Sequence, residues 1–310
     1  MAQKILITGG AGYIGSILCR KLLEHTSNEV VVFDNFMYGV EPILPLVSHK
    51  RFKMVEGDIR SDKIRVPVSE ADVVMHLAAI VGFPACMANP ANATGTNVDG
   101  TKNVIRYMSG SQRLIFASTG SIYGRVEGVC SEDSGIEPIT LYGVTKYQAE
   151  QAAMQRENSL SLRFSTVFGV SPRMRMDLLV NDLVFQALRF RAIAIFERGA
   201  RRSFLHCDDT AQSYLFALDH FAEMEGNVYN VGNPGLNLSK HDVVMGIKKF
   251  LDFYLLEDPN RSDPDQRDYE VDFSKIMKLG YRPEFSLEDG IEELLKLYSV
   301  SSFYRHFRNS

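Results

Sequence analysis

A tyrosine and a lysine stand four positions apart, at Tyr142 and Lys146, and Thr119 ends an apolar run before them. Positions four apart share one face of a helix, so a phenol and an ammonium would be neighbours there. The ammonium favours phenolate and lowers the pKa of the tyrosine. Such a phenolate can accept a proton from an alcohol held by Thr119 while a hydride leaves the same carbon. About half of one such Tyr-Lys pair arises by chance in a chain of this composition, so the motif carries weight only in its context.

That context begins with the glycine-rich stretch that runs from Lys4 to Gly15. Its apolar start predicts a buried strand, and the apolar spacing beyond it predicts a helix. Gly9 permits a tight turn, Gly12 lets the main chain approach a pyrophosphate, and Gly15 lets the helix pack on the strand. The helix N-terminus offers unpaired N–H groups to phosphates. The stretch therefore predicts a dinucleotide site.

An acidic residue, Asp34, follows Gly15 by 19 positions at the end of a second apolar run. A carboxylate at this place accepts hydrogen bonds from ribose hydroxyls and repels a 2′-phosphate, which favours NAD over NADP. No Gly-Lys-Ser/Thr follows the glycines, so a nucleotide-hydrolysing P-loop is disfavoured.

The composition excludes several classes of protein. The chain has 310 residues, 45% hydrophobic and 23% charged, with no apolar run long enough to span a membrane. The first strand starts too early to leave room for a signal peptide, and four widely spaced cysteines indicate neither a metal site nor a disulfide framework. We expect a cytoplasmic location.

The net charge of −4 disfavours nucleic-acid binding, whereas seven arginines between residues 173 and 202 indicate that the ligand is a phosphorylated small molecule.

The alternation of strands and helices predicts an α/β fold, a Rossmann-type doubly wound parallel sheet. Helices are expected at 13–25, 95–109 and 141–157, and one strand-like run extends over 160–168. We assign residues 1–168 to an NAD-binding domain and 169–310 to a smaller C-terminal α/β substrate-binding domain, with segments at about 200–230 returning to the first. A capping box is expected at Ser286–Asp289.

With these motifs in place, the chain resembles the extended short-chain dehydrogenases/reductases that act on nucleotide sugars. The resemblance covers about two-thirds of the chain, through the stretches 8–15, 34–36, 57–59, 76–79, 97–101, 118–124, 142–146 and 202–209. It implies NAD as cofactor, a nucleoside-diphosphate sugar as substrate, and a homodimer formed through the helices at 95–109 and 141–157. The outward faces of those helices would then carry Val104, Tyr107 or Ala153.

The resemblance also implies roles for individual residues. Thr119, Tyr142 and Lys146 match the catalytic residues. Contacts to the cofactor are implied for Gly9, Gly12, Tyr13, Ile14, Gly15, Asp34, Asn35, Asp58, Ile59, Leu77, Ala78, Ala79, Asn97, Ser118, Tyr142, Lys146 and Phe164. Contacts to the substrate are implied for Val81, Gly82, Thr119, Ser121, Thr166, Arg175, Asn181, Arg202 and Arg267.

Departures from the family pattern bear on the reaction. Family 4,6-dehydratases carry Asp-Glu after the catalytic threonine, whereas this chain has Gly120 and Ser121. An alcohol does not replace those acids, so oxidation at C4 followed by re-reduction, an epimerisation, is the reaction we expect. The stretch 171–182 resembles a subgroup that includes a GDP-heptose 4-dehydrogenase, and Thr166 stands where galactose epimerases carry Asn. Release of the ketose therefore remains an alternative, followed by dehydration and, last, a non-catalytic NAD-binding regulator.

Two further side chains could do chemistry, His76 and Cys86. We expect His76 to pack at a strand end and Cys86 to be a small buried hydrophobe. For Arg173, substrate contact and structural pairing are equally open.

Overall fold

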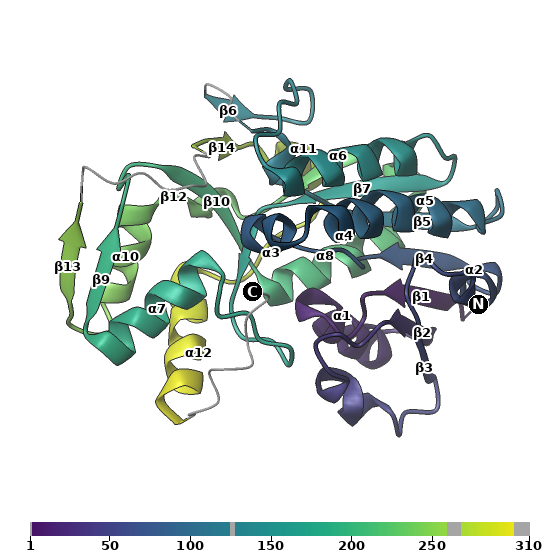
Figure 1. Cartoon of the computed structure of the whole chain (residues 1–310), viewed down its shortest axis with the longest axis horizontal. Helices are drawn as coiled ribbons and strands as arrows, with labels where there is room; N and C mark the ends of the chain where they lie inside the picture. Colours follow the sequence, from purple (N-terminus) through teal and green to yellow (C-terminus); the bar gives the residue numbers. More distant parts are fainter. Residues whose placement is uncertain (1, 125–127, 259–267, 301–310) are drawn as a thin grey trace.

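A seven-stranded sheet forms the centre of the computed structural model, which describes residues 2–124, 128–258 and 268–300 (Figure 1). The strand order is β11-β7-β5-β4-β1-β2-β3, and every neighbouring pair is parallel. The strands are β1 (Lys4–Thr8), β2 (Glu29–Asp34), β3 (Phe52–Glu56), β4 (Val73–His76), β5 (Arg113–Thr119), β7 (Ser159–Phe164) and β11 (Val228–Val231). The predicted Rossmann-type α/β fold is confirmed.

Helices cover both faces of this sheet, because successive strand side chains point to opposite sides. Ile5 and Ile7 of β1 belong to the core that includes α1, whereas Leu6 packs with Val104 and Ala149 on the other side. The helices of the first face are α1 (Tyr13–His25) and α8 (Cys207–Asp219), and those of the second are α2 (Arg65–Ser69), α5 (Thr101–Arg106) and α6 (Leu141–Met154).

The helix expected at 95–109 begins earlier and ends earlier. It runs as α4 (Pro90–Thr94), a π-helical segment η3 (Gly95–Gly100) and α5. The Asn89 side chain accepts a hydrogen bond from the Asn92 N–H at 3.0 Å, and Pro90 takes the first helical position, where its missing N–H costs nothing. The helix at 13–25 is as predicted, and α6 ends at Met154, three residues short of the expected end.

The strand-like run at 160–168 is two strands in two sheets. After β7, the Ser165 N–H donates to the Val231 carbonyl at 3.0 Å, and the chain then leaves the central sheet. It continues as β8 (Thr166–Phe168), which pairs with β10 (Arg201–His206). The sequence pattern continues through the break and does not say which sheet a strand joins, so the break is not visible in it.

The later part of the chain builds a second group of elements around β8. It comprises a three-stranded sheet of β8, β10 and β12 (Asn237–Ser239), the pair of β9 (Ala192–Ile195) and β13 (Tyr254–Glu257), and the helices α7 (Leu179–Phe190), α10 (Lys240–Lys248), α11 (Ser274–Lys278) and α12 (Leu287–Val300). Its strand β14 (Glu270–Val271) pairs with β6 (Val129–Cys130), which comes from the earlier part of the chain. The segment 207–231 lies with the central sheet as α8 and β11. Short helices complete the description: η1 (Glu41–Leu46), η2 (Asp62–Ile64), α3 (Phe83–Ala88), η4 (Gly120–Ile122), α9 (Phe221–Met224) and η5 (Pro234–Leu236).

Two residues expected on the outward faces of the dimer helices are inside the protomer. Val104 and Ala153 are fully buried in the core beneath the sheet, so they cannot mark a subunit contact. The Tyr107 hydroxyl donates to Asp62 at 2.5 Å.

The predicted capping box is confirmed, because the Asp289 N–H donates to Ser286 Oγ at 3.2 Å and the Ser286 N–H donates to the Asp289 carboxylate at 2.8 Å. No helix in the described ranges has both the length and the apolar character needed to cross a bilayer.

Candidate active site

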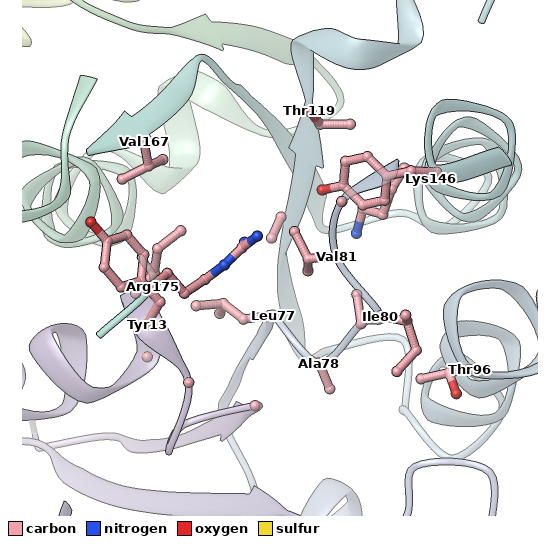
Figure 2. A pocket seen from close by; sticks show the side chains of 18 of the residues that line it. Tyr13, Leu77, Ala78, Ile80, Val81, Thr96, Thr119, Lys146, Val167 and Arg175 are labelled. Atoms are coloured by element: carbon pink, nitrogen blue, oxygen red, sulfur yellow. The ribbon is translucent and has the colours of Figure 1, made fainter. Parts of the chain in front are cut away.

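The largest group of predicted site residues meets in one cavity at the carboxyl ends of the central strands (Figure 2). Ligands of open parallel sheets bind at this edge. The predicted residues that line the cavity are Gly9, Gly12, Tyr13, Ile14, Gly15, Asp34, Asn35, Asp58, Ile59, Leu77, Ala78, Ala79, Val81, Gly82, Ser118, Thr119, Ser121, Tyr142, Lys146, Phe164, Thr166 and Arg175. The two motifs found in the sequence, the glycine turn and the Tyr-Lys pair, therefore share one cavity.

The glycine turn has the shape that a phosphate cradle needs. Gly9 has φ +74°, and a Cβ on it would lie 2.8 Å from the Ala78 nitrogen. A Cβ on Gly15 would meet the Gly9 carbonyl oxygen and lie 2.7 Å from the Gly10 Cα. Gly15 thus allows α1 to pack on the turn itself, a correction to the expected packing on the strand. No side chain caps the start of α1, so the helix N-terminus is open to an anion.

Asp34 ties this turn to the end of β2. Its carboxylate accepts hydrogen bonds from the Ala11 N–H at 3.0 Å and the Phe36 N–H at 2.9 Å. Burial raises the pKa of the Asp34 carboxyl, and the main-chain donors oppose that rise. A carboxylate can accept about four hydrogen bonds, so capacity remains for ribose hydroxyls.

The catalytic candidates are brought together by the start of α6. Thr140 caps the helix, its Oγ1 accepting from the Gly143 N–H at 3.1 Å. A Cβ on Gly143 would lie 2.6 Å from the Ser121 carbonyl oxygen, so glycine lets this first turn approach the end of β5 closely. Tyr142 therefore lies in the same cavity as Thr119, and Figure 2 shows Thr119 and Lys146 on one side of it.

Lys146 is a buried cation with an aromatic neighbour. Its side chain is 4% exposed, and its Nζ lies 4.2 Å from the centroid of the Phe116 ring. Burial lowers the pKa of Lys146 to about 7, while the nearby Glu150 and Cys86 act to raise it. The group can therefore exchange a proton near neutral pH.

His76 and Cys86 have packing roles. The two ring nitrogens of His76 lie 2.6 Å from Thr8 Oγ1 and 2.9 Å from Thr101 Oγ1. Burial, with the Lys146 charge, lowers the pKa of His76 to about 3, so the ring is neutral. Cys86 is fully buried and donates to the Ile80 carbonyl at 3.4 Å.

Two predicted contact residues hold loops instead of lining the cavity. The Asn97 amide accepts from the Ile80 N–H at 2.7 Å and donates to the Ile80 carbonyl at 3.0 Å, so it fixes the segment after β4. Asn181 is fully buried, accepts from the Gly169 N–H at 3.0 Å and donates to the Arg175 carbonyl at 2.8 Å. Neither residue is in the set that lines the cavity, and both amides bond main-chain groups, so their contact with a ligand stays a prediction.

Three other predicted residues need separate comment. Arg202 is buried on β10 and is outside the set that lines the cavity. Arg267 lies outside the described residues. The Tyr13 hydroxyl donates to the Gly169 carbonyl at 2.7 Å, so the Tyr13 phenol joins α1 to the loop after β8 and leaves only its main chain to the phosphate cradle.

Several lining residues were not assigned to the cofactor from the sequence, among them Tyr38, Ser165 and Arg173. Only Arg173 carried a signal, as part of the arginine-rich stretch. Three buried polar atoms on the cavity residues have no hydrogen-bond partner among the described residues: Ser118 Oγ, Ser165 Oγ and Arg173 Nη2. Unsatisfied buried groups of this kind fit a polar ligand, as the open turn fits a dinucleotide.

Comparisons with known proteins agree with this geometry. The sequence profile described as the NAD dependent epimerase/dehydratase family matches residues 5–232. A Bacillus subtilis relative, the uncharacterized UDP-glucose epimerase YtcB, is 29% identical over 98% of this chain and 99% of its own length. The Bacillus cereus UDP-glucuronic acid 4-epimerase, solved with UDP-glucuronic acid and NAD, is similar with a TM-score of 0.86 and 29% identity, covering 96% of this chain and 99% of that one.

A third similar protein is the Campylobacter jejuni UDP-Glc/GlcNAc 4-epimerase, with a TM-score of 0.82, 30% identity, and coverage of 96% of this chain and 99% of that chain. The profile match covers most of the chain, from β1 through β11. This protein is therefore an enzyme of the NAD-dependent epimerase/dehydratase family, with NAD as its cofactor.

Proposed function

We propose that the enzyme is a nucleotide-sugar C4 epimerase, which oxidises the C4 hydroxyl to a transient ketone and reduces it again on the other face. The observation that carries this proposal is the arrangement of Thr119, Tyr142 and Lys146 in the cavity that the glycine turn also lines. Positions 120 and 121, where dehydratases need acids, hold Gly and Ser.

Each of the three residues has a role that follows from its chemistry. Tyr142, as phenolate, accepts the proton of the C4 hydroxyl and later returns it. Lys146, in its protonated form, stabilises the phenolate, and Thr119 orients the hydroxyl. NAD, when bound, accepts and returns the hydride. Because the proton and the hydride both return to the sugar, the reaction consumes no second substrate.

Arg175 is suited to the anionic part of the substrate. Its guanidinium forms an ion pair with Asp177 at 2.5 Å and would lie 3.5 Å from a Cβ on Gly82. Figure 2 shows this side chain reaching toward the middle of the cavity. A guanidinium there can bind phosphate or carboxylate oxygens in a bidentate manner. Since one similar structure contains UDP-glucuronic acid, uronic sugars belong in any substrate trial.

The second candidate is a 4-dehydrogenase that releases the ketose. The segment 171–182, which supplies Arg173 and Arg175 to the cavity, favours it through its resemblance to GDP-heptose oxidoreductases. A dehydrogenase accumulates NADH in proportion to substrate, whereas an epimerase shows no net absorbance rise at 340 nm.

The test is turnover of UDP-, GDP-, CDP- and dTDP-sugars followed by NMR of the products, for the wild type and the variant Tyr142→Phe. Loss of a positioned acid–base group is expected to lower kcat about 10²- to 10⁴-fold, with NAD binding retained. Tyr254→Phe, an exposed tyrosine on β13, is the matched control and should behave as the wild type. Full turnover by Tyr142→Phe contradicts the mechanism, and a ketose product assigns the dehydrogenase.

We also propose a homodimer formed through α5 and α6, and a cytoplasmic location. The family resemblance supports the dimer, although Val104 and Ala153 are buried within the protomer. The four cysteines are free thiols, in keeping with a reducing compartment. A monomeric mass at micromolar concentration in light scattering contradicts the dimer.

A further inference from the structure

Arg173 is a buried cation that the catalytic mechanism does not use. It lies between β8 and α7, and its side chain is 5% exposed. Its guanidinium carbon is 4.1 Å from the centroid of the Tyr38 ring, and its Nη1 donates to the Met174 carbonyl at 2.9 Å. Its Nη2 is buried with no partner among the described residues, although the side chain lines the cavity. A buried N–H donor without a partner in the protein is expected to donate to an acceptor on a bound ligand.

The charges around the cavity single out Arg173. Of the lining cations in the described ranges, Arg175 is paired with Asp177, and Lys146 has Glu150 nearby on the same helix. No ion pair of Arg173 with a carboxylate occurs in this part of the chain. Burial, with the neighbouring Arg175 charge, lowers the pKa of Arg173 even though Asp177 and Tyr38 act to raise it. The burial of this cation is therefore not fully compensated, and a bound anion would recover the cost.

The position of Tyr38 indicates which anion that is. Tyr38 follows Asp34 by four residues in the loop after β2, and both line the same cavity as Gly9 and Gly12. This is the dinucleotide end of the cavity, whereas Thr119 and Lys146 mark its reaction end. The dinucleotide expected at this end carries its negative charge on the diphosphate that joins its two nucleosides.

The loop that carries Arg173 is anchored to the helix of the glycine turn. The Tyr13 hydroxyl donates to the Gly169 carbonyl at 2.7 Å, and Ser171 Oγ donates to the Tyr13 carbonyl at 2.6 Å. The loop that carries Arg173 is therefore bonded directly to the first residue of α1, which follows the glycine turn.

We propose that Arg173, stacked on Tyr38, binds the diphosphate of NAD opposite the glycine turn and retains the cofactor through successive turnovers. The turn supplies main-chain N–H groups on one side of the diphosphate, and the guanidinium supplies the positive charge on the other. Tyr38 restricts the side chain and thereby lowers the entropy lost on binding. The proposal concerns the cofactor and holds for an epimerase or a dehydrogenase.

The first test measures binding to the protein freed of nucleotide, by calorimetry with NAD and with ADP-ribose, which keeps the diphosphate and lacks nicotinamide. Arg173→Gln is expected to weaken both about 10- to 100-fold, and to speed NADH release in stopped-flow fluorescence. Arg198→Gln, which removes an exposed arginine on the surface, is the control and should bind as the wild type. Unchanged ADP-ribose affinity overturns the proposal, as does a loss confined to UDP binding by the NAD-loaded protein.

A second pair of variants guards against misfolding of the Arg173 loop, since that side chain also bonds the Met174 carbonyl. Tyr38→Phe keeps the ring and should bind ADP-ribose within about twofold of the wild type, whereas Tyr38→Leu should lose about 3- to 10-fold. Equal affinities in the Phe and Leu variants refute the stacking role. Thermal unfolding of each variant establishes that the fold is retained.

Discussion

Replacement of Lys146 by methionine should make the protein more stable at pH 6 while abolishing turnover. Methionine has similar length and no charge, so Lys146→Met removes a buried ammonium from the core beneath the active site. Stability and activity then change in opposite directions, as expected where a catalytic group is held in an unfavourable setting.

The magnitude follows from the pKa shift. Burial lowers the pKa of Lys146 from 10.5 to about 7. At about 1.4 kcal/mol per unit, this shift corresponds to about 5 kcal/mol when the group is charged in both the folded and unfolded states. Methionine loses the contact between the ammonium and the Phe116 ring, about 1–2 kcal/mol, which leaves a net gain in the free energy of unfolding of about 3–4 kcal/mol.

The pH dependence gives the sharper test. Because the folded pKa lies below the unfolded one, the unfolded chain binds more protons between about pH 7 and pH 10.5, and the wild type gains stability from this group as pH rises through that window. The advantage of Lys146→Met is therefore largest below pH 7 and shrinks toward pH 10. Urea unfolding of both proteins at several pH values measures it.

The control for that experiment is Lys102→Met, which changes an exposed lysine on α5. It should show no comparable pH-dependent gain. If Lys146→Met is less stable than the wild type by the same amount at pH 6 and pH 9, the burial argument for Lys146 is refuted.

Two further substitutions test the frame around the site. Gly143→Ala should lower kcat about 10- to 100-fold with little change in NAD affinity, because the new Cβ would lie 2.6 Å from the Ser121 carbonyl oxygen and displace Tyr142. The control is Gly110→Ala, which has open space around it and should leave the steady-state kinetics unchanged. Glu150→Ala should reduce the free energy of unfolding by about 3–5 kcal/mol, because it leaves the buried Arg163, which pairs with Glu150 at 2.7 Å, without its carboxylate partner. Glu292→Ala, which breaks an exposed pair, should cost under about 1 kcal/mol in the same urea titration, and equal losses in the two glutamate variants would contradict this reasoning.

The parts of the site that the sequence predicted are those encoded locally. The glycine turn, Asp34 and the Tyr142–Lys146 pair each depend on a few adjacent residues whose spacing fixes their geometry, and all line the cavity. The alternation of strands and helices likewise predicted the central sheet, since short connections leave few arrangements for parallel strands.

The parts that it did not predict depend on contacts between distant segments. Tyr38 and Arg173 come from distant parts of the sequence and are in contact, and the sequence around one residue does not indicate that it contacts the other. Asn97 and Asn181 have polar side chains that could bind a ligand, but both are buried and their amide oxygens accept hydrogen bonds from main-chain N–H groups. The break at Ser165 was hidden because residues on both sides of it have strand-like patterns, and these patterns do not say which sheet a strand joins.

The return of α8 and β11 to the central sheet limits how this chain can be divided. Packing of α8 against α1, and of β11 on β7, completes the half of the molecule that carries the glycine turn, and its parts are encoded on both sides of the segment that contains β8, α7, β9 and β10. A gene fragment ending near residue 168 would leave the apolar surface of α1 and one sheet edge uncovered. Recombination between relatives that exchanges the segment between β7 and α8 must therefore cut and rejoin the gene at more than one place, because a two-part fusion at residue 168 separates α8 and β11 from the sheet that they complete.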